Sequence, residues 1–181
     1  MIQLPESENV PSPEQQKEVL DDNARKFVLD SLAPTFIEEG NEVVFLMTTD
    51  WLETGQDTEK KLAYKKFRNG DVQILLIAKV TKDGHRTSEK TKINEAQYND
   101  LLKQSICRVQ KIRHEFQHTQ NGVVFDVKYD EFIDSPLRVL EVDAGSEKER
   151  EAFNPTDFQA GVSEVTGQSE YYGYRVASII K

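Results

Sequence analysis

Charged residues two positions apart recur along this chain and could together form a binding site. In a β-strand, alternate side chains point to the same face, so residues two positions apart lie side by side. Lysine and arginine side chains facing the inside of a barrel would hold a polyanion, and carboxylates on neighbouring strands would hold its metal ion. The sets at this spacing are Lys66 with Arg68, Arg86 with Ser88 and Lys90, Lys111 with Arg113, Lys128 with Asp130, and Glu141 with Asp143.

The stretch Asp22-Asn-Ala24-Arg-Lys26 belongs to the same pattern but is incomplete. As a strand, it would place Asp22, Ala24 and Lys26 on one face, with an alanine between the acid and the lysine. A solvated edge strand would explain this arrangement. So would a charged binding site that lacks one of its members.

The simplest explanation of each charged pair, taken alone, is the solvent-facing side of an antiparallel strand. Two features argue against this explanation for the whole set. Most pairs have one sign within a strand, whereas a solvated face usually mixes signs. Aliphatic residues also flank Lys79 and Glu141, which indicates partial burial. Buried charges must find partners or a ligand.

Strands dominate the elements that must position these charges. Runs rich in β-branched and aromatic residues alternate with turn residues. Asn69-Gly70 is the expected turn of one hairpin, and Gln120-Asn121-Gly122 that of a second. Many antiparallel strands in one small domain favour closure, which removes exposed edges. The expected strands lie at residues 24–29, 42–52, in the hairpin 60–80, and at 85–93, 105–116, 122–132, 137–144 and 161–166.

Short helices are expected between and after the strands. Asn94 is the expected N-cap of a helix over residues 93–104, and Ser146 that of a helix ending near Phe153. A final helix is expected in 171–180, and a short one from Ser12 to about Leu20. We therefore predict a mobile N-terminal segment over residues 1–20 and a single domain over 21–181. The fold class is α+β and dominated by β-structure.

Composition limits the partners and the compartment. The chain has 181 residues and a net charge of −9, which argues against nucleic acid as the main partner. It has one cysteine, no signal-peptide pattern at its start and no apolar run of the roughly 18 residues that cross a bilayer. We expect a cytoplasmic protein without a membrane partner, and the sequence leaves a homodimer open.

In order along the chain, seven motifs resemble those of the CYTH superfamily, the triphosphate tunnel metalloenzymes. The first strand of that family, E-x-E-x-K, resembles Asp22-Asn-Ala24-Arg-Lys26, and its R-x-R and following lysine resemble Lys66-Phe-Arg68 and Lys79. Its R-x-E-x-E, K-x-R and next aspartate resemble Arg86-Thr-Ser88-Glu-Lys90, Lys111-Ile-Arg113 and Asp130. Its E-V-E and late E-V-T resemble Glu141-Val-Asp143 and Glu164-Val165-Thr166.

The resemblance implies an eight-stranded antiparallel closed barrel, a triphosphate tunnel, with a few short flanking helices. It implies a small molecule that contains a triphosphate as the ligand and Mg²⁺ or Mn²⁺ as the cofactor. Lys26 would lie near the transferred group as the catalytic residue. The implied phosphate-binding residues are Lys26, Lys66, Arg68, Lys79, Arg86, Lys111 and Arg113. The implied metal ligands are Asp22, Glu141, Asp143 and Glu164, with Asp130 as a further candidate.

The chain departs from the family pattern at its acids. Ala24, Ser88, Lys90 and Lys128 stand where the family has acidic residues. The basic set remains almost complete, so the implied site suits an anion but offers fewer oxygen ligands to a metal. Mg²⁺ needs only one or two carboxylates besides phosphate oxygens and water, so metal binding is weakened in expectation.

Several functions follow from this pattern. The first is metal-assisted hydrolysis of a phosphoanhydride, as in a triphosphatase. The second is a degenerate, CYTH-like binding protein or sensor for a nucleotide, polyphosphate or phosphorylated metabolite. An adenylyl cyclase and a scaffold with internal salt bridges are further alternatives. Metal dependence distinguishes the first from the second.

Overall fold

The computed structural model describes residues 17–21, 23–31 and 42–179. A single antiparallel sheet of ten strands makes up most of this part. Its strand order is β1-β6-β5-β4-β3-β7-β8-β9-β2-β10. The strands are β1 (Lys17–Asp21), β2 (Arg25–Val28), β3 (Val43–Thr54), β4 (Thr58–Phe67), β5 (Val72–Lys82), β6 (His85–Lys92), β7 (Cys107–Gln120), β8 (Val123–Phe132), β9 (Arg138–Asp143) and β10 (Ser163–Glu164).

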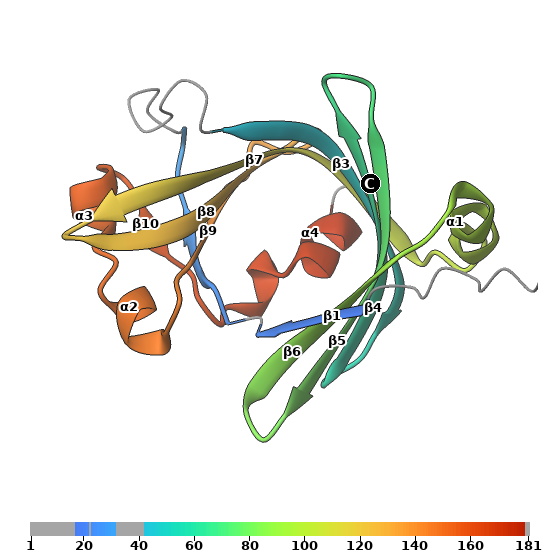
Figure 1. Ribbon diagram of the computed structural model, residues 1–181, viewed down its shortest axis with the longest axis horizontal. Helices are drawn as coiled ribbons and strands as arrows, with labels where there is room; N and C mark the ends of the chain where they lie inside the picture. The colour runs from blue at the N-terminus through green and yellow to red at the C-terminus, as the bar shows by residue number, and fades with distance from the viewer. Residues whose placement is uncertain (1–16, 22, 32–41, 180–181) are drawn as a thin grey trace, which may run out of the picture.

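The sheet curves around the C-terminal helix α4 (Gly173–Ile179), which lies on its concave side (Figure 1). Val176 and Ala177 of α4 pack against inward-facing Trp51, Val109 and Phe132. This apolar cluster fills one end of the concave side. Trp51 is therefore a core residue of the inner wall.

Short helices cover the convex side of the sheet (Figure 1). Helix α1 (Glu95–Leu102) packs through Tyr98 on Leu62 and Ile74, and the predicted capping residue Asn94 begins it. On the other half, Phe153 and Phe158 pack against outward-facing residues of β2, β7, β8 and β9. The remaining helices are α2 (Glu147–Glu151), α3 (Pro155–Phe158) and η2 (Ser169–Tyr171). No helix among the described residues is long and apolar enough to cross a membrane.

The predicted β-dominated, antiparallel class is confirmed, but the sheet differs from a closed eight-stranded barrel. It has ten strands in the part of the chain that the structure describes, and β1 and β10 are its two edges there. The reason is that the first strand is divided. β1 pairs with β6, after which the chain crosses through Asn23 and Ala24 so that β2 pairs with β9. The chain itself thus joins the two halves of the sheet at this place.

The N-terminal prediction also needs correction. Residues 17–20, expected to end a helix, belong to strand β1, because their backbone pairs with residues 88–91 of β6. For residues 17–20, backbone pairing with the edge strand β6 outweighs the helix predicted from the start signal at Ser12. Residues 1–16 and the expected mobile tip lie outside the described residues.

Gly173 allows α4 to approach the inner wall, and its replacement tests this packing. A Cβ atom at position 173 would lie 2.8 Å from Cζ2 of Trp51 and 3.2 Å from Cη2, closer than such atoms pack. We expect Gly173→Ala to lower the free energy of unfolding by about 1–3 kcal/mol. Thermal and urea unfolding would measure it.

The same substitution in a Trp51→Phe background is the control for this prediction. A phenyl ring lacks the second ring that Cζ2 and Cη2 belong to, so the alanine should cost much less there. An equal cost in both backgrounds would show that Trp51 is not what limits the space at position 173.

Candidate functional site

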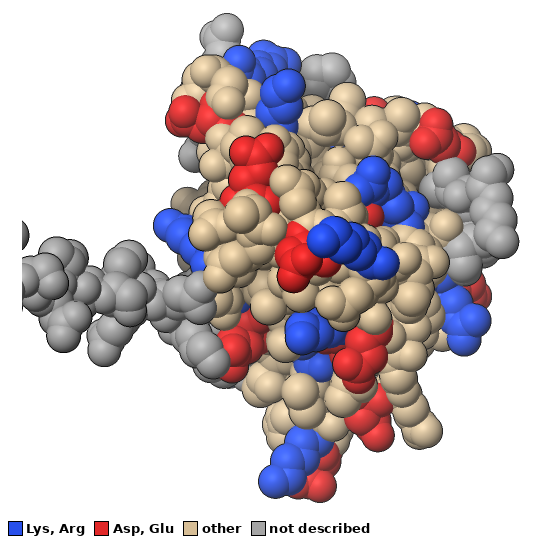
Figure 2. Space-filling model, turned by 90° about the vertical axis from the view of Figure 1, so that its right-hand side faces the viewer, with Lys and Arg blue, Asp and Glu red and all other residues tan. Residues whose placement is uncertain are grey.

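A cavity of about 1080 Å³ lies on the concave side of the sheet. Of the residues that the structure describes, ten lysines and arginines line it, against five aspartates and glutamates, which leaves a surplus of five positive charges. The face seen in Figure 2 instead intersperses acidic and basic side chains, as a solvated surface usually does. The charged lining residues are Lys26, Lys61, Lys65, Lys79, Arg86, Lys90, Lys111, Arg113, Lys128, Arg150, Glu59, Glu115, Asp126, Glu141 and Asp143.

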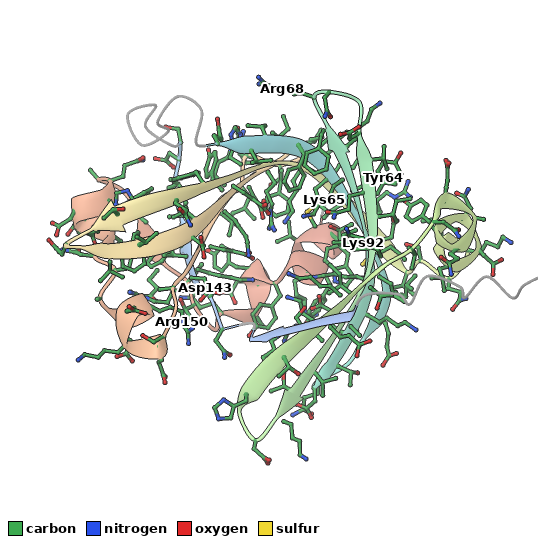
Figure 3. The ribbon with its side chains drawn as sticks, in the orientation of Figure 1. Tyr64, Lys65, Arg68, Lys92, Asp143 and Arg150 are labelled. Carbon is green, nitrogen blue, oxygen red and sulfur yellow. The ribbon has the colours of Figure 1, made fainter. Side chains whose placement is uncertain are left out.

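Strand alternation decides which residues of β4 reach this cavity. Glu59, Lys61 and Lys65 line it, whereas Tyr64 packs beneath α1 on the convex side. In Figure 3, Lys65 points toward the concave side and Arg68 projects from the β4–β5 hairpin away from it. Lys66 is exposed, and neither Lys66 nor Arg68 lines the cavity. The predicted inward face of this strand was therefore wrong by one residue.

Among the described residues of the wall formed by β4, β5 and β6 that line the cavity, one is a carboxylate and five are cations. Glu59 is only 9% exposed and accepts hydrogen bonds from Lys61 Nζ at 2.5 Å and Arg86 Nη2 at 2.9 Å. Burial raises the pKa of Glu59, but Lys61 and Lys79 outweigh it, so the net shift is downward. Glu59 is thus an ionised counter-ion inside the wall.

Lys61 is the most perturbed amine of this wall. Its ammonium lies 5.5 Å from the ring centroid of Trp51. Burial, reinforced by the positive charge of Lys79, lowers the pKa of Lys61 to about 8 despite the contact with Glu59. A desolvated cation beside other cations is stabilised when an anion approaches, so Lys61 is placed to bind one.

The opposite wall, formed by β7, β8, β9 and β2, is organised by Asp130. This carboxylate is 1% exposed and accepts bonds from Lys111 Nζ at 2.5 Å and from both Nε and Nη2 of Arg113 at 2.6 Å. Burial raises the pKa of Asp130, but Arg113 and Lys111 hold it below its usual value. The fork of Arg113 on Asp130 fixes both side chains in one geometry.

Glu141, on β9, connects this second wall to Lys26 of β2. Lys26 Nζ lies 3.4 Å and Arg113 Nη2 lies 3.6 Å from its carboxylate oxygens. Burial raises the pKa of Glu141, yet Lys26, Arg113 and Lys111 together hold the pKa well below its usual range. Glu141 therefore neutralises cations of two strands, β2 and β7.

Most of the predicted basic residues meet in the cavity. Lys26, Lys79, Arg86, Lys111 and Arg113 line it. So do Ala24, Ser88, Lys90 and Lys128, the four positions where the sequence departs from the family pattern. Sequence reasoning missed Glu59, Lys61 and Lys65.

The predicted metal ligands that the structure describes do not all meet in the cavity. Glu141 and Asp143 line the cavity, and Asp143 accepts a hydrogen bond from Arg150 at 3.3 Å. Asp130 lies behind its two cations. Glu164 does not line the cavity and is held by Arg25 at 2.7 Å and 3.0 Å. Asp22 lies outside the described residues.

The described donors do not fit the Mg²⁺ or Mn²⁺ that the resemblance implies. No three acidic, histidine or cysteine side chains of the described ranges are grouped so that they could hold a metal ion. Glu59 and Glu141 contact cations of the wall instead. A carboxylate held by lysine or arginine offers fewer lone pairs to a metal, so we derive no step through a metal ion.

Comparison with solved structures gives the fold a precedent. The inorganic triphosphatase NE1496 is 23% identical and matches with a TM-score of 0.55, over 86% of this chain and 97% of that one. A second structure, titled the hypothetical protein NE1496, is 22% identical with a TM-score of 0.56, over 90% and 100%. The chain has the fold of these structures. The β-dominated, antiparallel fold is thus shared with a protein named an inorganic triphosphatase. No protein-family model and no curated protein matches the sequence.

Asp130 should be essential to stability because two buried cations depend on it. Asp130→Asn would leave Lys111 desolvated without its hydrogen-bonded counter-ion, and Arg113 with the more distant Glu141 at 3.6 Å. We expect the free energy of unfolding to fall by about 3–5 kcal/mol, measured by urea denaturation.

Asp126→Asn is the matched control, since Asp126 is an exposed carboxylate on the same strand and accepts only a bond from Gln117. It should change stability by no more than about 0.5 kcal/mol. Equal effects of the two substitutions would refute the counter-ion role of Asp130.

Proposed function

We propose that this cavity binds a polyanion of the triphosphate class. The observation that carries the proposal is the separation of charge. The whole chain has a net charge of −9 while the cavity wall has a surplus of five positive charges, so the rest of the molecule carries −14. In an acidic protein whose cations line a concave wall, the electrostatic attraction is strongest for a small ligand of high negative charge.

The size and chemistry of the cavity support the same ligand class. Its volume of about 1080 Å³ slightly exceeds the roughly 300–1,000 Å³ typical of small-molecule sites, so it has room for such a ligand. Lysines and arginines reach it from β2, β4, β5, β6, β7 and β8. Phosphoryl oxygens accept several hydrogen bonds each, so a chain of phosphates can use donors on facing walls at once.

A second candidate function is hydrolysis of a phosphoanhydride. The observation that favours it is that the fold is that of a protein titled an inorganic triphosphatase. In this reaction water attacks a phosphoryl group, the P–O bond of the anhydride breaks, and the shortened phosphate leaves. Lys26, which lies beside Glu141, would stabilise the charge on the transferred group. The paired carboxylates favour binding over hydrolysis.

The binding function is tested with inorganic tripolyphosphate and variants of two lysines on the same strand. Lys61→Met removes an ammonium from the wall, so we expect the affinity to fall tenfold or more, about the contribution of one hydrogen bond to a charged group. Titration calorimetry would measure it, with phosphate release followed in the same samples.

Lys66→Met is the matched control, because Lys66 is exposed and does not line the cavity. It should leave affinity unchanged. Equal losses in both variants would show that binding is only a surface-charge effect. Phosphate release that Lys26→Ala abolishes would assign the protein to the hydrolases.

The affinity for tripolyphosphate should weaken as pH rises through the lowered pKa of Lys61. Below about 8 this amine is charged and attracts the anion, whereas above that value it is neutral. The free energy of unfolding of the ligand-free protein should instead increase as pH rises. A folded pKa of about 8 against an ordinary 10.5 means that the unfolded chain binds more protons between these values, so Lys61 favours folding increasingly with pH.

Dissociation constants and urea unfolding between about pH 6.5 and 10 would measure both trends. The ionisation of the ligand is common to all variants, so the comparison with Lys61→Met isolates this amine. An identical pH profile in the variant would contradict the role given to Lys61.

A further inference from the structure

The positive surplus of the cavity is not spread evenly over its two walls. On the wall formed by β4, β5 and β6, five cations among the described residues line the cavity against the carboxylate of Glu59. On the wall formed by β7, β8, β9 and β2, four cations face four lining carboxylates. The second wall is neutral before Asp130 behind it is counted. An anion is therefore attracted to the first wall.

An unsatisfied hydroxyl lies on that same wall. Ser88 is 3% exposed, lines the cavity, and its Oγ has no hydrogen-bond partner among the described residues. A buried hydroxyl without a partner lowers stability unless something completes it. Because Ser88 faces the cavity, its hydroxyl can donate a hydrogen bond to an oxygen of the ligand.

Strand register places this hydroxyl among lysines. Lys79 lies directly opposite Ser88 on the neighbouring strand. Lys61 and Lys90 both pair with Ile77 from its two sides, so they share one row across β4, β5 and β6. Two strand spacings separate their backbones by roughly 10 Å, which two extended lysine side chains can span. These amines can thus converge on one phosphoryl group beside Ser88.

We propose that this wall holds one phosphoryl group of the ligand directly, without a divalent ion, between the hydroxyl of Ser88 and the ammonium groups of Lys61, Lys79 and Lys90. The inference rests on the proposed function and specifies its ligand as a metal-free polyphosphate. The ammonium groups supply the positive charge that a bound metal would otherwise supply. Both carboxylate oxygens of Glu59 already accept hydrogen bonds, from Lys61 and Arg86, which leaves fewer lone pairs for a metal ion.

The first test is Ser88→Ala, measured by calorimetry with tripolyphosphate in buffer containing EDTA. The variant removes an unsatisfied hydroxyl from the free protein and a donor from the complex. We expect a higher melting temperature without ligand and an affinity reduced about threefold to tenfold. A merely structural serine would change the melting temperature and leave the affinity unchanged, which would overturn the proposal.

The second test reverses one charge of the wall. Lys90→Glu should reduce the affinity for tripolyphosphate in EDTA at least tenfold, because a negatively charged carboxylate replaces an ammonium that donates a hydrogen bond to the phosphate. Lys66→Glu makes the same change of charge at an exposed position outside the cavity and should not reduce it. Both variants are first checked for folding by circular dichroism, and Lys90→Met is measured in place of Lys90→Glu if the latter fails to fold. Equal losses for positions 66 and 90 would overturn the proposal.

The wild-type protein, titrated with and without Mg²⁺, separates this inference from the proposed function. Equal or tighter binding of tripolyphosphate in EDTA supports both. Binding that requires Mg²⁺ leaves the proposed function standing and refutes the metal-free site. No binding in either buffer refutes both.

Discussion

The rest of the structure depends on the neutralisation of cations that the curved sheet removes from water. Desolvation of an ammonium or guanidinium costs several kcal/mol, so a wall of lysines and arginines folds only where buried carboxylates compensate it. Asp130 does this for Lys111 and Arg113, and Glu59 does it for Lys61 and Arg86. These acids are therefore structural counter-ions. The same contacts that hold the walls together remove the carboxylates from metal binding.

The shape of the sheet follows from how its two halves are connected and how its concave side is packed. The division of the first strand lets one short segment serve both β6 and β9, with Asn23 and Ala24 lining the cavity between them. At one end of the concave side, Trp51 and α4 form an apolar plug, and elsewhere Phe45, Met47 and Leu75 form a second apolar cluster. The charged residues thus lie on walls that apolar packing keeps in place, which strengthens electrostatic attraction for a ligand.

Strand positions could be predicted from the sequence to a large extent, but not the face of β4, and the reason is the length of one loop. Asn-Gly occurs twice. At Asn121-Gly122 it forms the whole two-residue loop, since Gln120 pairs with Val123. At Asn69-Gly70 the loop includes Arg68 as a third residue, because Phe67 N–H donates to Asp71 O at 2.9 Å and Gly70 adopts φ 91°. The extra residue shifts the pairing by one, so Glu59 rather than Lys60 faces Lys79, and Lys61 and Lys65 replace Lys66 and Arg68 in the site.

Apolar contacts of β4 with neighbouring elements determine which of these two registers of β4 on β5 forms. Lys60-Lys61 and Lys65-Lys66 are doublets, so charge alone does not indicate which member faces inward. The observed register places Leu62 beneath α1 and stacks Phe67 on Phe45, with ring centroids 5.1 Å apart. The alternative register would turn Leu62 and Phe67 to the opposite faces of the sheet, which breaks both apolar contacts, and would place Ala63 opposite Leu76 in place of Leu62. Apolar packing on both faces therefore decides which lysine of each doublet reaches the ligand, and long-range contacts of this kind are not visible in the local pattern of the strand.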